Sequence, residues 1–440
     1  MKKRILSLIL CVAISFSFVA CNTDRDLPLE SQVQLGEEES EGSAQIISCG
    51  GGDTEIVDDG YDAEEARRAA MNFAVNLFQQ NLIYQMEEEQ SLDNTLISPL
   101  SVYLALGMLE NGAKGETLAQ LEQALGMNVG QMNCYVKAYL EQLTEEVRIA
   151  NSIWFTDHQR FTINNDFVYV NETYYGAELY KAPFDKTTVK EINDWVENRT
   201  EGMIKDILDE IPADAVMYLI NALVFEADWA DTYDKSEVRK GVFHIDGYEG
   251  CEKQNVDMMY SEEGYYLEDE HATGFIKYYE DRKYAFAALL PNEDVDVYTY
   301  AKSLTGEKLL ALLDMPVEVH VNAAMPAFVT EYQVEMKDVL KQMGIVDAFD
   351  GDKADFSGLG TSAAGNIFAD RVIHKTFIEV SPVGTKAGAA TVIEMRDECV
   401  AIYDDSKEVI LDRPFIYMII DCETNQPIFM GTVNHVETQK

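Results

Sequence analysis

The chain has 440 residues, of which 47% are hydrophobic and 25% are charged, the composition of a globular protein with a sizeable core. Its 34 basic and 78 acidic residues give a formal net charge of −44 at pH 7, so the chain repels nucleic-acid phosphates, and we exclude nucleic acid as a partner. The seven cysteines are scattered without a C-x-x-C pair, which argues against a disulfide framework; we expect no metal and no other cofactor.

The N-terminus has the pattern of an export signal. Basic residues at positions 2 to 4 precede an apolar stretch, Ile5–Ala20, that is shorter than the roughly 20 residues needed to span a membrane. The stretch ends in Phe18-Val19-Ala20-Cys21, which resembles the lipobox of bacterial lipoproteins, where the chain is cut before the cysteine and the cysteine is lipidated. The alternative is an ordinary secretory signal followed by a coincidental cysteine. Under both interpretations residues 1–20 are a signal peptide outside the folded domain.

The next segment, residues 21–62, is acidic and has little apolar periodicity. It contains the run Glu37-Glu38-Glu39-Ser40-Glu41 and three consecutive glycines at positions 50 to 52. This composition is typical of a disordered tether. With a lipid on Cys21, the tether would hold the domain away from the membrane. We therefore expect a cell-envelope lipoprotein exposed on the outer surface, or a secreted protein if the cysteine carries no lipid.

The main body begins with helices. A first helix is predicted by apolar residues at helical spacing, namely Ala66, Ala70, Phe73 and Leu77. Ser98 and Pro99 are typical N-cap and first-turn residues for a helix over Leu100–Glu110. Further helices are predicted over Leu118–Leu125 and Val189–Thr200.

Strands dominate the second half of the chain. Tyr218–Phe225 is nearly all apolar, as expected for a strand buried on both faces, and Val317–Val321 alternates as a half-buried strand does. Val372–Val380 is a third candidate strand, and Phe415–Ile420 and Ile428–Val433 flank a turn that predicts a hairpin. Helices first and strands later favour the α+β class.

Several segments of this body resemble, in chain order, segments of the serpin family of protease inhibitors. Each segment alone is a weak signal, whereas the whole series in the family's order is specific. The segments are Ser98-Pro99-Leu100-Ser101, Gly112–Thr117, Ile192–Lys205, Asn221–Trp229, Val346–Phe349, Ala354–Gly358, Val372–Val380, Gly384–Thr391, Arg413-Pro414-Phe415 and Phe429-Met430-Gly431. The resemblance implies one α+β domain, residues 63–438, with three β-sheets, about nine helices and an exposed reactive loop.

The resemblance also implies the activity, which is that of a suicide inhibitor and not of an enzyme. A target protease attacks a bond in the reactive loop and forms a covalent acyl-enzyme. The cut loop then inserts into the central sheet as a new strand and traps the protease. The implied partner is a serine endopeptidase, with cysteine endopeptidases as a further class, and we expect the inhibitor to be a monomer.

The segment expected to insert has the alternation of a strand with one buried face. From Thr385 to Met395 every second residue is small or apolar, whereas the other set ends in Glu394 and Arg396. Pro382 stands where the family usually has Glu, and proline suits a strand terminus better than a strand interior. By resemblance the hinge consists of Gly384, Thr385, Lys386, Ala387, Gly388, Ala389, Ala390 and Thr391.

Three positions are open for the bond that the protease cuts. The family's usual distance from the hinge places it at Glu398–Cys399, which we favour because the hinge sets how much strand can insert. Counting back from the segment after the loop places it near Tyr403, and Arg396 is a third candidate. Glu398 suits a protease with a basic specificity pocket, Tyr403 a chymotrypsin- or subtilisin-like enzyme, and Arg396 a trypsin-like one.

The resemblance assigns five residues to the control of sheet opening. Ser98, Ser101, Asn221 and His374 would form a polar cluster beneath the central sheet, and Trp229 would lie near its upper opening. A buried network of this kind must be fully hydrogen-bonded, and its rearrangement can switch a two-state sheet. The alternative for His374 is a core histidine without a switching role.

Two other classes of function are alternatives to inhibition. An enzyme is disfavoured because the chain has no G-x-S-x-G, H-E-x-x-H, Walker or dinucleotide-binding motif, and its six histidines are widely spaced. A non-inhibitory, serpin-fold surface binding protein is the second alternative. The small hinge residues Ala387–Ala390 argue against it, whereas Pro382 keeps it open.

Overall fold

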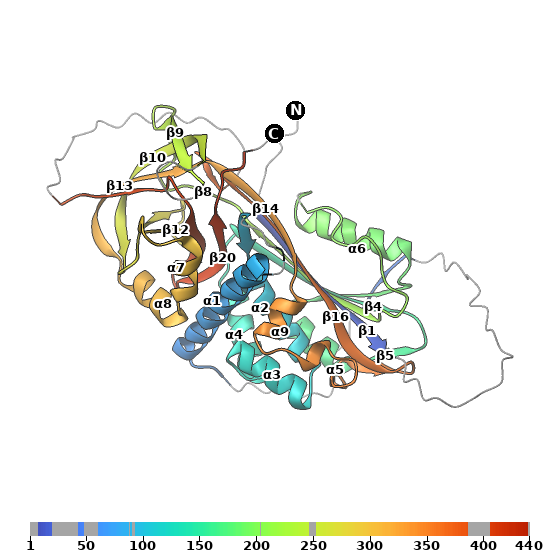
Figure 1. Cartoon of the computed structure of the whole chain (residues 1–440). Coiled ribbons are helices and arrows are strands. Elements are labelled where there is room, and N and C mark those ends of the chain that lie inside the picture. Colours follow the sequence, from blue (N-terminus) through green and yellow to red (C-terminus); the bar gives the residue numbers. More distant parts are fainter. Residues whose placement is uncertain are drawn as a thin grey trace.

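The computed structural model describes residues 8–19, 43–47, 60–87, 89, 93–202, 204–245, 252–385 and 405–438, and the counts below refer to these residues. They form nine α helices together with strands that belong mostly to two large sheets (Figure 1). This arrangement confirms the α+β class expected from the sequence. None of the helices in the described ranges is long and apolar enough to cross a membrane.

The helices include all four that the sequence predicts, which are now α1, α2, α3 and α6. The described helices are α1 (Ala63–Glu87), α2 (Pro99–Glu110), α3 (Gly115–Leu125), α4 (Val129–Leu140), α5 (Asn165–Tyr175), α6 (Lys186–Arg199), α7 (Val297–Ser303), α8 (Gly306–Asp314) and α9 (Lys337–Gln342), with a 3-10 turn η1 (Asp347–Phe349). Helices α4 and α5 gave no signal because they bury asparagine and tyrosine beside apolar residues, which blurs the hydrophobic periodicity.

The first large sheet, called the central sheet below, has the strand order β14-β16-β1-β7-β4-β6-β2. Every residue of its strand β7 is buried, which confirms the strand predicted there as buried on both faces. The strands are β14 (Phe328–Glu335), β16 (Asn366–Val380), β1 (Leu8–Val19), β7 (Met217–Phe225), β4 (Val147–Thr156), β6 (Glu178–Ala182) and β2 (Gln45–Ile47).

The second large sheet has the order β18-β13-β10-β11-β12-β19-β20-β3, with β9 paired to β10. Its strands are β18 (Lys407–Ile410), β13 (Val317–Pro326), β10 (Lys253–Glu268), β11 (Ala272–Tyr278), β12 (Tyr284–Pro291), β19 (Phe415–Asp421), β20 (Gln426–Val433), β3 (Thr95–Ile97) and β9 (Val238–His244). Strands β19 and β20 confirm the predicted hairpin. Two short ladders pair β5 (Phe161–Ile163) with β15 (Gly360–Ser362), and β8 (Ala227–Asp228) with β17 (Gly384–Thr385).

Helix α2 begins where the sequence predicts and is buried along its whole length. The Ser98 hydroxyl caps it by accepting a hydrogen bond from the Ser101 backbone N–H at 3.2 Å, and Pro99 occupies the first turn. All 12 residues of α2 are buried, because the helix contacts β1 and β7 of the central sheet as well as α1 and β20. This position carries Ser98 and Ser101 to the underside of the central sheet.

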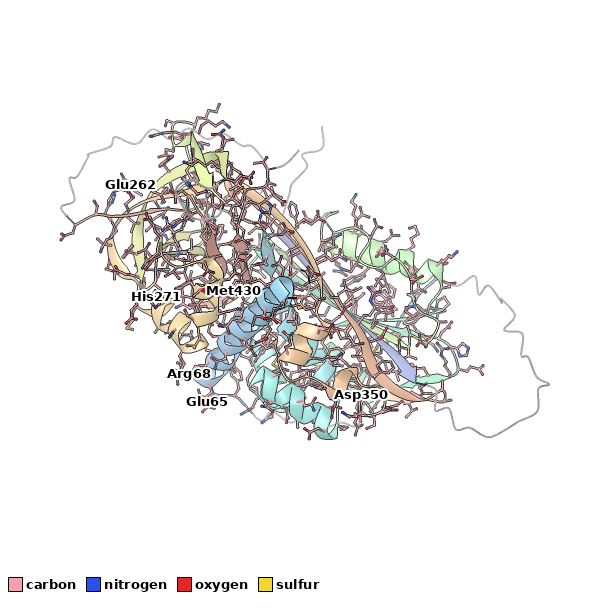
Figure 2. The ribbon with its side chains drawn as sticks, in the orientation of Figure 1. Glu65, Arg68, Glu262, His271, Asp350 and Met430 are labelled. Carbon is pink, nitrogen blue, oxygen red and sulfur yellow. The ribbon has the colours of Figure 1, made fainter. Side chains whose placement is uncertain are left out.

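The central sheet separates two hydrophobic cores. On one face α1, α2 and the second sheet enclose the larger core, and on the other face α6 covers a smaller one (Figure 1). Ile192, Trp195 and Val196 of α6 pack there against residues of β7 such as Ile220. Figure 2 shows Met430 of β20 in the middle of the molecule, whereas Arg68 and Asp350 point outward at its periphery.

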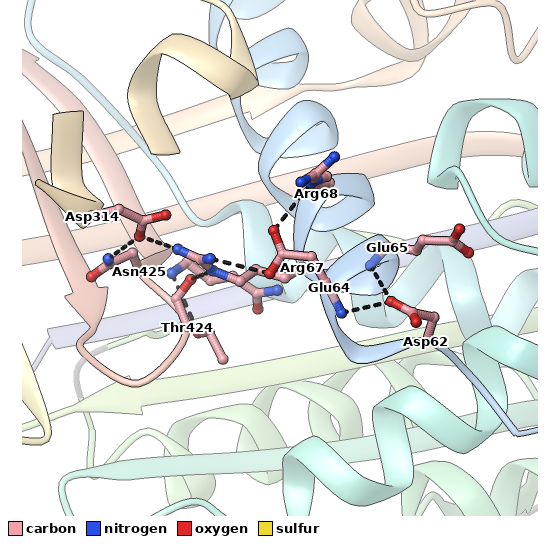
Figure 3. A network of polar contacts seen from close by, with 9 residues as sticks. Asp62, Glu64, Glu65, Arg67, Arg68, Asp314, Thr424 and Asn425 are labelled. Atoms are coloured by element: carbon pink, nitrogen blue, oxygen red, sulfur yellow. Dashed lines mark hydrogen bonds and ion pairs between the residues drawn. The ribbon is translucent and has the colours of Figure 1, made fainter. Parts of the chain in front are cut away.

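A polar network holds the start of α1 against the C-terminal hairpin (Figure 3). Asp62 caps the helix by accepting hydrogen bonds from the backbone N–H groups of Glu64 and Glu65, at 3.0 and 2.9 Å. Arg67 donates to the Thr424 carbonyl at 2.6 Å and pairs with Asp314 at the end of α8. These contacts hold the start of α1 against both the C-terminal hairpin and the end of α8.

Two N-terminal segments differ from the sequence-based expectation. Leu8–Val19, expected outside the folded domain, forms β1 in the middle of the central sheet. Gln45–Ile47, expected within a disordered tether, forms the edge strand β2 on β6, and Ala44 donates to the Glu191 carboxylate of α6 at 3.0 Å. The physical reason is that an extended apolar segment can satisfy sheet backbone groups that would otherwise lack partners.

Candidate functional site

Strands β7 and β16 run in the same direction and are separated by a slot one strand wide. Strand β1 fills this slot and is antiparallel to both neighbours, from Leu8 beside Phe225 at one end to Val19 beside Asn366 at the other. We call the Phe225 end the upper end and the Asn366 end the lower end. Because β7 and β16 each present a row of backbone donors and acceptors, a strand in the slot gains two ladders of hydrogen bonds.

A central polar cluster, made of Ser98, Ser101, Asn151, Asn221 and His374, lies beside the slot at mid-length. The Ser98 N–H donates to His374 Nε2 at 3.2 Å, and the Ser101 hydroxyl donates to Asn221. The Asn221 amide donates to Asn151 Oδ1 at 2.7 Å, and all five residues are at most 3% exposed. The structure thus brings together the four residues grouped by the resemblance. It adds Asn151 of β4, which no pattern in the sequence had indicated.

His374 is neutral in this environment. Its Nε2 accepts the bond from Ser98, so the proton resides on Nδ1, and Nδ1 has no hydrogen-bond partner among the described residues. Burial lowers the pKa of His374 to about 3. Val12 of β1 pairs with His374 on one side and with Asn221 on the other, so the cluster straddles the slot.

The first two residues of the predicted hinge, Gly384 and Thr385, lie at the upper end of the slot. In the ladder between β17 and β8, Gly384 pairs with Asp228 and Thr385 with Ala227. A Cβ on Gly384 would lie 2.3 Å from the Ala227 carbonyl oxygen, so the close approach of the two backbones requires glycine. Thr385 is 1% exposed, and its hydroxyl shares a hydrogen bond of 2.6 Å with that of Tyr279.

Trp229 holds the segment that precedes the hinge. Its backbone N–H donates to the Val383 carbonyl and its indole N–H to the Ser381 carbonyl, both at 2.9 Å. Its ring stacks on Tyr279, with centroids 4.5 Å apart and planes inclined by 11°. The structure therefore places Trp229 at the upper end of the slot.

A buried ion pair supports this aromatic stack. Lys277 contacts Glu263 at 2.9 Å, and the two side chains are 3% and 10% exposed. The Lys277 ammonium lies 5.5 Å from the ring centroid of Trp229 and 4.5 Å from that of Tyr233, within cation–π range. Burial raises the pKa of Glu263, and the charge of Lys277 opposes this shift.

We call Glu263, Lys277, Trp229, Tyr233 and Tyr279 the hinge anchor. Of these residues only Trp229 could be identified from the sequence, because Glu263 and Lys277 come from the separate strands β10 and β11 and no spacing rule links them. Their pairing was invisible until the strands were placed side by side.

Pro382 lies in a bend directly after β16. The bend is closed by a hydrogen bond of 3.0 Å from the Ser381 N–H to the Gly384 carbonyl, and the Pro382 carbonyl accepts from the Tyr233 N–H at 2.9 Å. A proline fits such a bend, because its fixed φ angle and missing N–H interrupt no ladder there.

The remaining predicted site residues lie outside the described ranges. They are the rest of the hinge (Lys386, Ala387, Gly388, Ala389, Ala390, Thr391), the candidate cleavage positions (Arg396, Glu398 with Cys399, Tyr403) and the lipidation residue Cys21. Within the described part of the chain, no three His, Cys, Asp or Glu side chains are grouped so that they could hold a metal ion.

The sequence and the fold both match one protein family. The model of the Serpin (serine protease inhibitor) family matches residues 68–436, which is most of the chain. This protein therefore belongs to the serpin family.

Individual relatives agree with this assignment. The chain is 31% identical to human Serpin B8 over 375 residues, which covers 82% of this chain and 96% of that protein. It is 29% identical to human neuroserpin over 367 residues, covering 79% and 87%. Among solved structures, the thermophilic serpin tengpin in its native state is 41% identical with a TM-score of 0.76, covering 85% and 95%. Tengpin in its latent state is 40% identical with a TM-score of 0.74, covering 87% and 100%.

Proposed function

We propose that this serpin is a suicide inhibitor of serine endopeptidases, with cysteine endopeptidases that form the same kind of acyl-enzyme as a second target class. The observation that carries the proposal is the slot beneath the hinge. Thr385 is already paired with β8 at the upper end, and a strand that continued its ladder would run down between β7 and β16. In a chain without residues 1–20, which now fill this slot as β1, a loop cut by a protease would therefore have a place to insert.

The register of such an insertion follows from pairs already present. Thr385 pairs with Ala227, and in the adjoining strand β7 Phe225 pairs with Leu8 of β1. Continuing the Thr385 ladder by two residues therefore brings Ala387 to the place that Leu8 now has.

This register favours one of the three candidate cleavage bonds. The slot holds 12 residues, so its last place, now taken by Val19, would fall to Glu398. Cleavage at Glu398–Cys399 would let the inserted strand use the whole length of the slot. Cleavage after Arg396 would leave the lower end of the slot unfilled. Cleavage near Tyr403 would give an inserted segment that is longer than the slot.

The inner face of the slot suits the loop in this register, whereas on the outer face Glu394 would need a charged partner, because Ser15, whose place it would take, is 2% exposed. The small and apolar set of loop residues would take the places of Ile14 and Phe16, both 0% exposed in the larger core. Glu394 would take the place of Ser15, whose cross-strand neighbour in β16 is Arg371. An acidic residue opposite a basic one stabilises a cross-strand pair.

The chemistry belongs to the protease. Its nucleophile attacks the Glu398 carbonyl carbon, the peptide bond to Cys399 breaks, and the new amine leaves with a proton from the protease's general acid. Glu398 remains bound to the protease as an ester or thioester. Insertion over the 12 places of the slot then moves this bond by roughly 40 Å, before water can hydrolyse it.

The test is incubation of residues 21–440 with proteases that cut after Glu, after Tyr and after Arg. We expect a complex that resists SDS, with mass spectrometry showing cleavage after Glu398. Cleavage without a complex and without a gain in heat stability would contradict inhibition, and would favour a non-inhibitory binding protein on the serpin fold.

We also propose that the chain is attached to the cell envelope through a lipid on Cys21. The proposal rests on the lipobox-like sequence before this cysteine. Cys21→Ser should move the protein from the membrane fraction to the soluble or secreted fraction and abolish labelling by a radioactive fatty acid. Unchanged membrane association of Cys21→Ser would contradict the proposal.

A further inference from the structure

The slot that the reactive loop would need is occupied by the N-terminus of the chain itself. Strand β1 pairs with β7 over nine residues, from Leu8 to Phe16, and with β16 from Ile9 to Val19. It lies in the middle of the seven-stranded central sheet (Figure 1). A strand with a ladder on each side is held by the backbone groups of both neighbours.

The side chains of β1 fit both faces of the slot. On the inner face Ile14 and Phe16 are 0% exposed, and the Phe16 ring meets that of Phe356 edge-on at 5.5 Å. On the outer face Ala13 is 1% exposed and belongs to the core beneath α6, together with Ile220 of β7. The apolar run that marks residues 5–20 as an export signal thus also serves as a buried strand.

The fit has one imperfection, on the outer face. The hydroxyl oxygens of Ser15 and Ser17 are buried and have no hydrogen-bond partner in the described part of the chain. A buried polar group without a partner opposes burial of its strand. The loop residues Glu394 and Arg396 would take these two places, where Glu394 would lie beside Arg371. The N-terminal strand is therefore more apolar than the loop. Glu394 of the loop would gain a charged neighbour in Arg371, whereas Arg396 would lie opposite Phe368 of β16.

We propose that Leu8–Val19 is an internal competitor of the reactive loop. While it remains attached it fills the slot, and a protease that cuts the loop is released after hydrolysis because the loop cannot insert. A chain without residues 1–20 has the slot free for the loop. The proposal rests on the proposed inhibitory function, and it makes the N-terminal segment a plug that keeps the uncut precursor inactive.

The first test compares three chains against the protease that residues 21–440 trap best. They are the full chain 1–440, residues 21–440, and the full chain with Ile14→Asp and Phe16→Asp, which would bury two carboxylates in an apolar core and so expel β1. We expect the SDS-resistant complex from the second and third chains, with at least a tenfold lower yield from the first. The matched control is the full chain with Thr23→Asp and Gln32→Asp, which adds the same charge outside β1 and should behave as the full chain does. Equal trapping by chains 1–440 and 21–440 would overturn the proposal.

A second measurement reports on the slot without requiring inhibition. Cys11 of β1 pairs with Ala222 of β7, and directly paired residues in antiparallel strands lie at a distance that a disulfide can bridge. In the full chain, Ala222→Cys should form a disulfide with Cys11 that mass spectrometry detects and that Cys11→Ser removes. Val224→Cys, two places away in the register and paired with Ile9, should crosslink to Cys11 much less.

The two measurements separate the plug from the inhibitory function. If the disulfide to Cys11 forms but none of the chains traps the protease, the proposed inhibitory function is wrong, although β1 does occupy the slot. If residues 21–440 and the full chain trap the protease equally and no disulfide forms, the chain is an inhibitor but Leu8–Val19 does not act as a plug.

Discussion

The central polar cluster and the hinge anchor lie along the same slot, yet they are built in opposite ways. The cluster contains only neutral groups, and among the described residues the Nδ1 of its histidine has no partner. The hinge anchor contains two full charges, on Lys277 and Glu263, that neutralise each other within a stack of aromatic rings. A donor without a partner can gain a hydrogen bond when a different strand occupies the slot. A buried ion pair, in contrast, loses stabilisation when its two charges are moved apart. We therefore expect the cluster to respond to what fills the slot, and the anchor to hold the hinge in place.

The largest effect is expected from a charge placed at the hinge itself. Thr385→Arg would put a guanidinium at a position that is 1% exposed, beside the hydroxyl of Tyr279. Because a buried charge without a partner opposes insertion by several kcal/mol, the ratio of covalent complex to cleaved inhibitor should fall on the order of a hundredfold. Denaturing gels of residues 21–440 with the trapped protease measure this ratio.

The control for Thr385→Arg is Lys386→Arg, which keeps the charge one residue further along and on the opposite set of the strand. It should leave the ratio within a factor of about two, since a basic residue is already present there. Normal trapping by Thr385→Arg would show that the hinge does not insert at this point.

The second effect breaks the hinge anchor. Lys277→Met leaves Glu263 buried without its partner, so the free energy of unfolding should fall by about 3–5 kcal/mol. Urea denaturation measures the change. Lys240→Met is the control, because the ion pair of Lys240 with Asp257 has side chains 76% and 51% exposed and is worth about 1 kcal/mol or less. Adding Glu263→Leu to Lys277→Met should restore most of the stability; a double variant no more stable than the single one would contradict the role of the charge.

The third effect concerns the cluster. His374→Ala removes the acceptor of the Ser98 N–H, so the free energy of unfolding should fall by about 1–3 kcal/mol. We also expect inactive inserted or polymeric forms to appear, which native gels detect after mild heating. An unchanged melting curve together with unchanged inhibition would leave His374 as a core residue without a switching role.

His374 also gives the stability a dependence on pH. Burial lowers its pKa to about 3, below the roughly 6.5 of an unfolded chain, so between these values the unfolded state binds more protons than the folded one. This contribution is fully present above pH 6.5 and is lost as the pH falls toward 3, by up to about 1.4 kcal/mol per pH unit. Denaturation of His374→Gln between pH 4 and 7 should show a shallower loss than the wild type, and parallel curves would contradict the assignment.

The smallest expected effect tests the register in which the loop would insert into the slot. Arg371→Gln should lower the ratio of complex to cleaved inhibitor by a few-fold at most, because a cross-strand ion pair with Glu394 is worth about 0.2–1 kcal/mol. The exchange of charges in Arg371→Glu with Glu394→Arg should recover the ratio, whereas Lys240→Gln, a change in the exposed ion pair with Asp257, should not affect it. If the exchanged pair does not recover the ratio of complex to cleaved inhibitor, Glu394 does not take the place of Ser15.

Local features of the fold could be predicted from the sequence because their signals are carried by neighbouring residues. The cap of Ser98 and Pro99 on α2, the fully apolar strand β7 and the hairpin of β19 and β20 each depend on a few adjacent positions. The alternation after Thr385 likewise shows in the sequence which loop residues suit a buried face. The family resemblance added the grouping of Ser98, Ser101, Asn221 and His374, which no local rule provides.

Only the tertiary structure decided which distant groups meet. Ser98 and His374 are 276 positions apart, and Glu263 and Lys277 belong to two different strands, so their partners depend on how the sheets assemble. The same reason explains the place of Leu8–Val19. Its apolar sequence determined that the segment avoids water, but a membrane and a protein core both satisfy this requirement. The slot between β7 and β16, with two rows of backbone groups and an apolar surface on each face, decided that the segment becomes a strand of the central sheet.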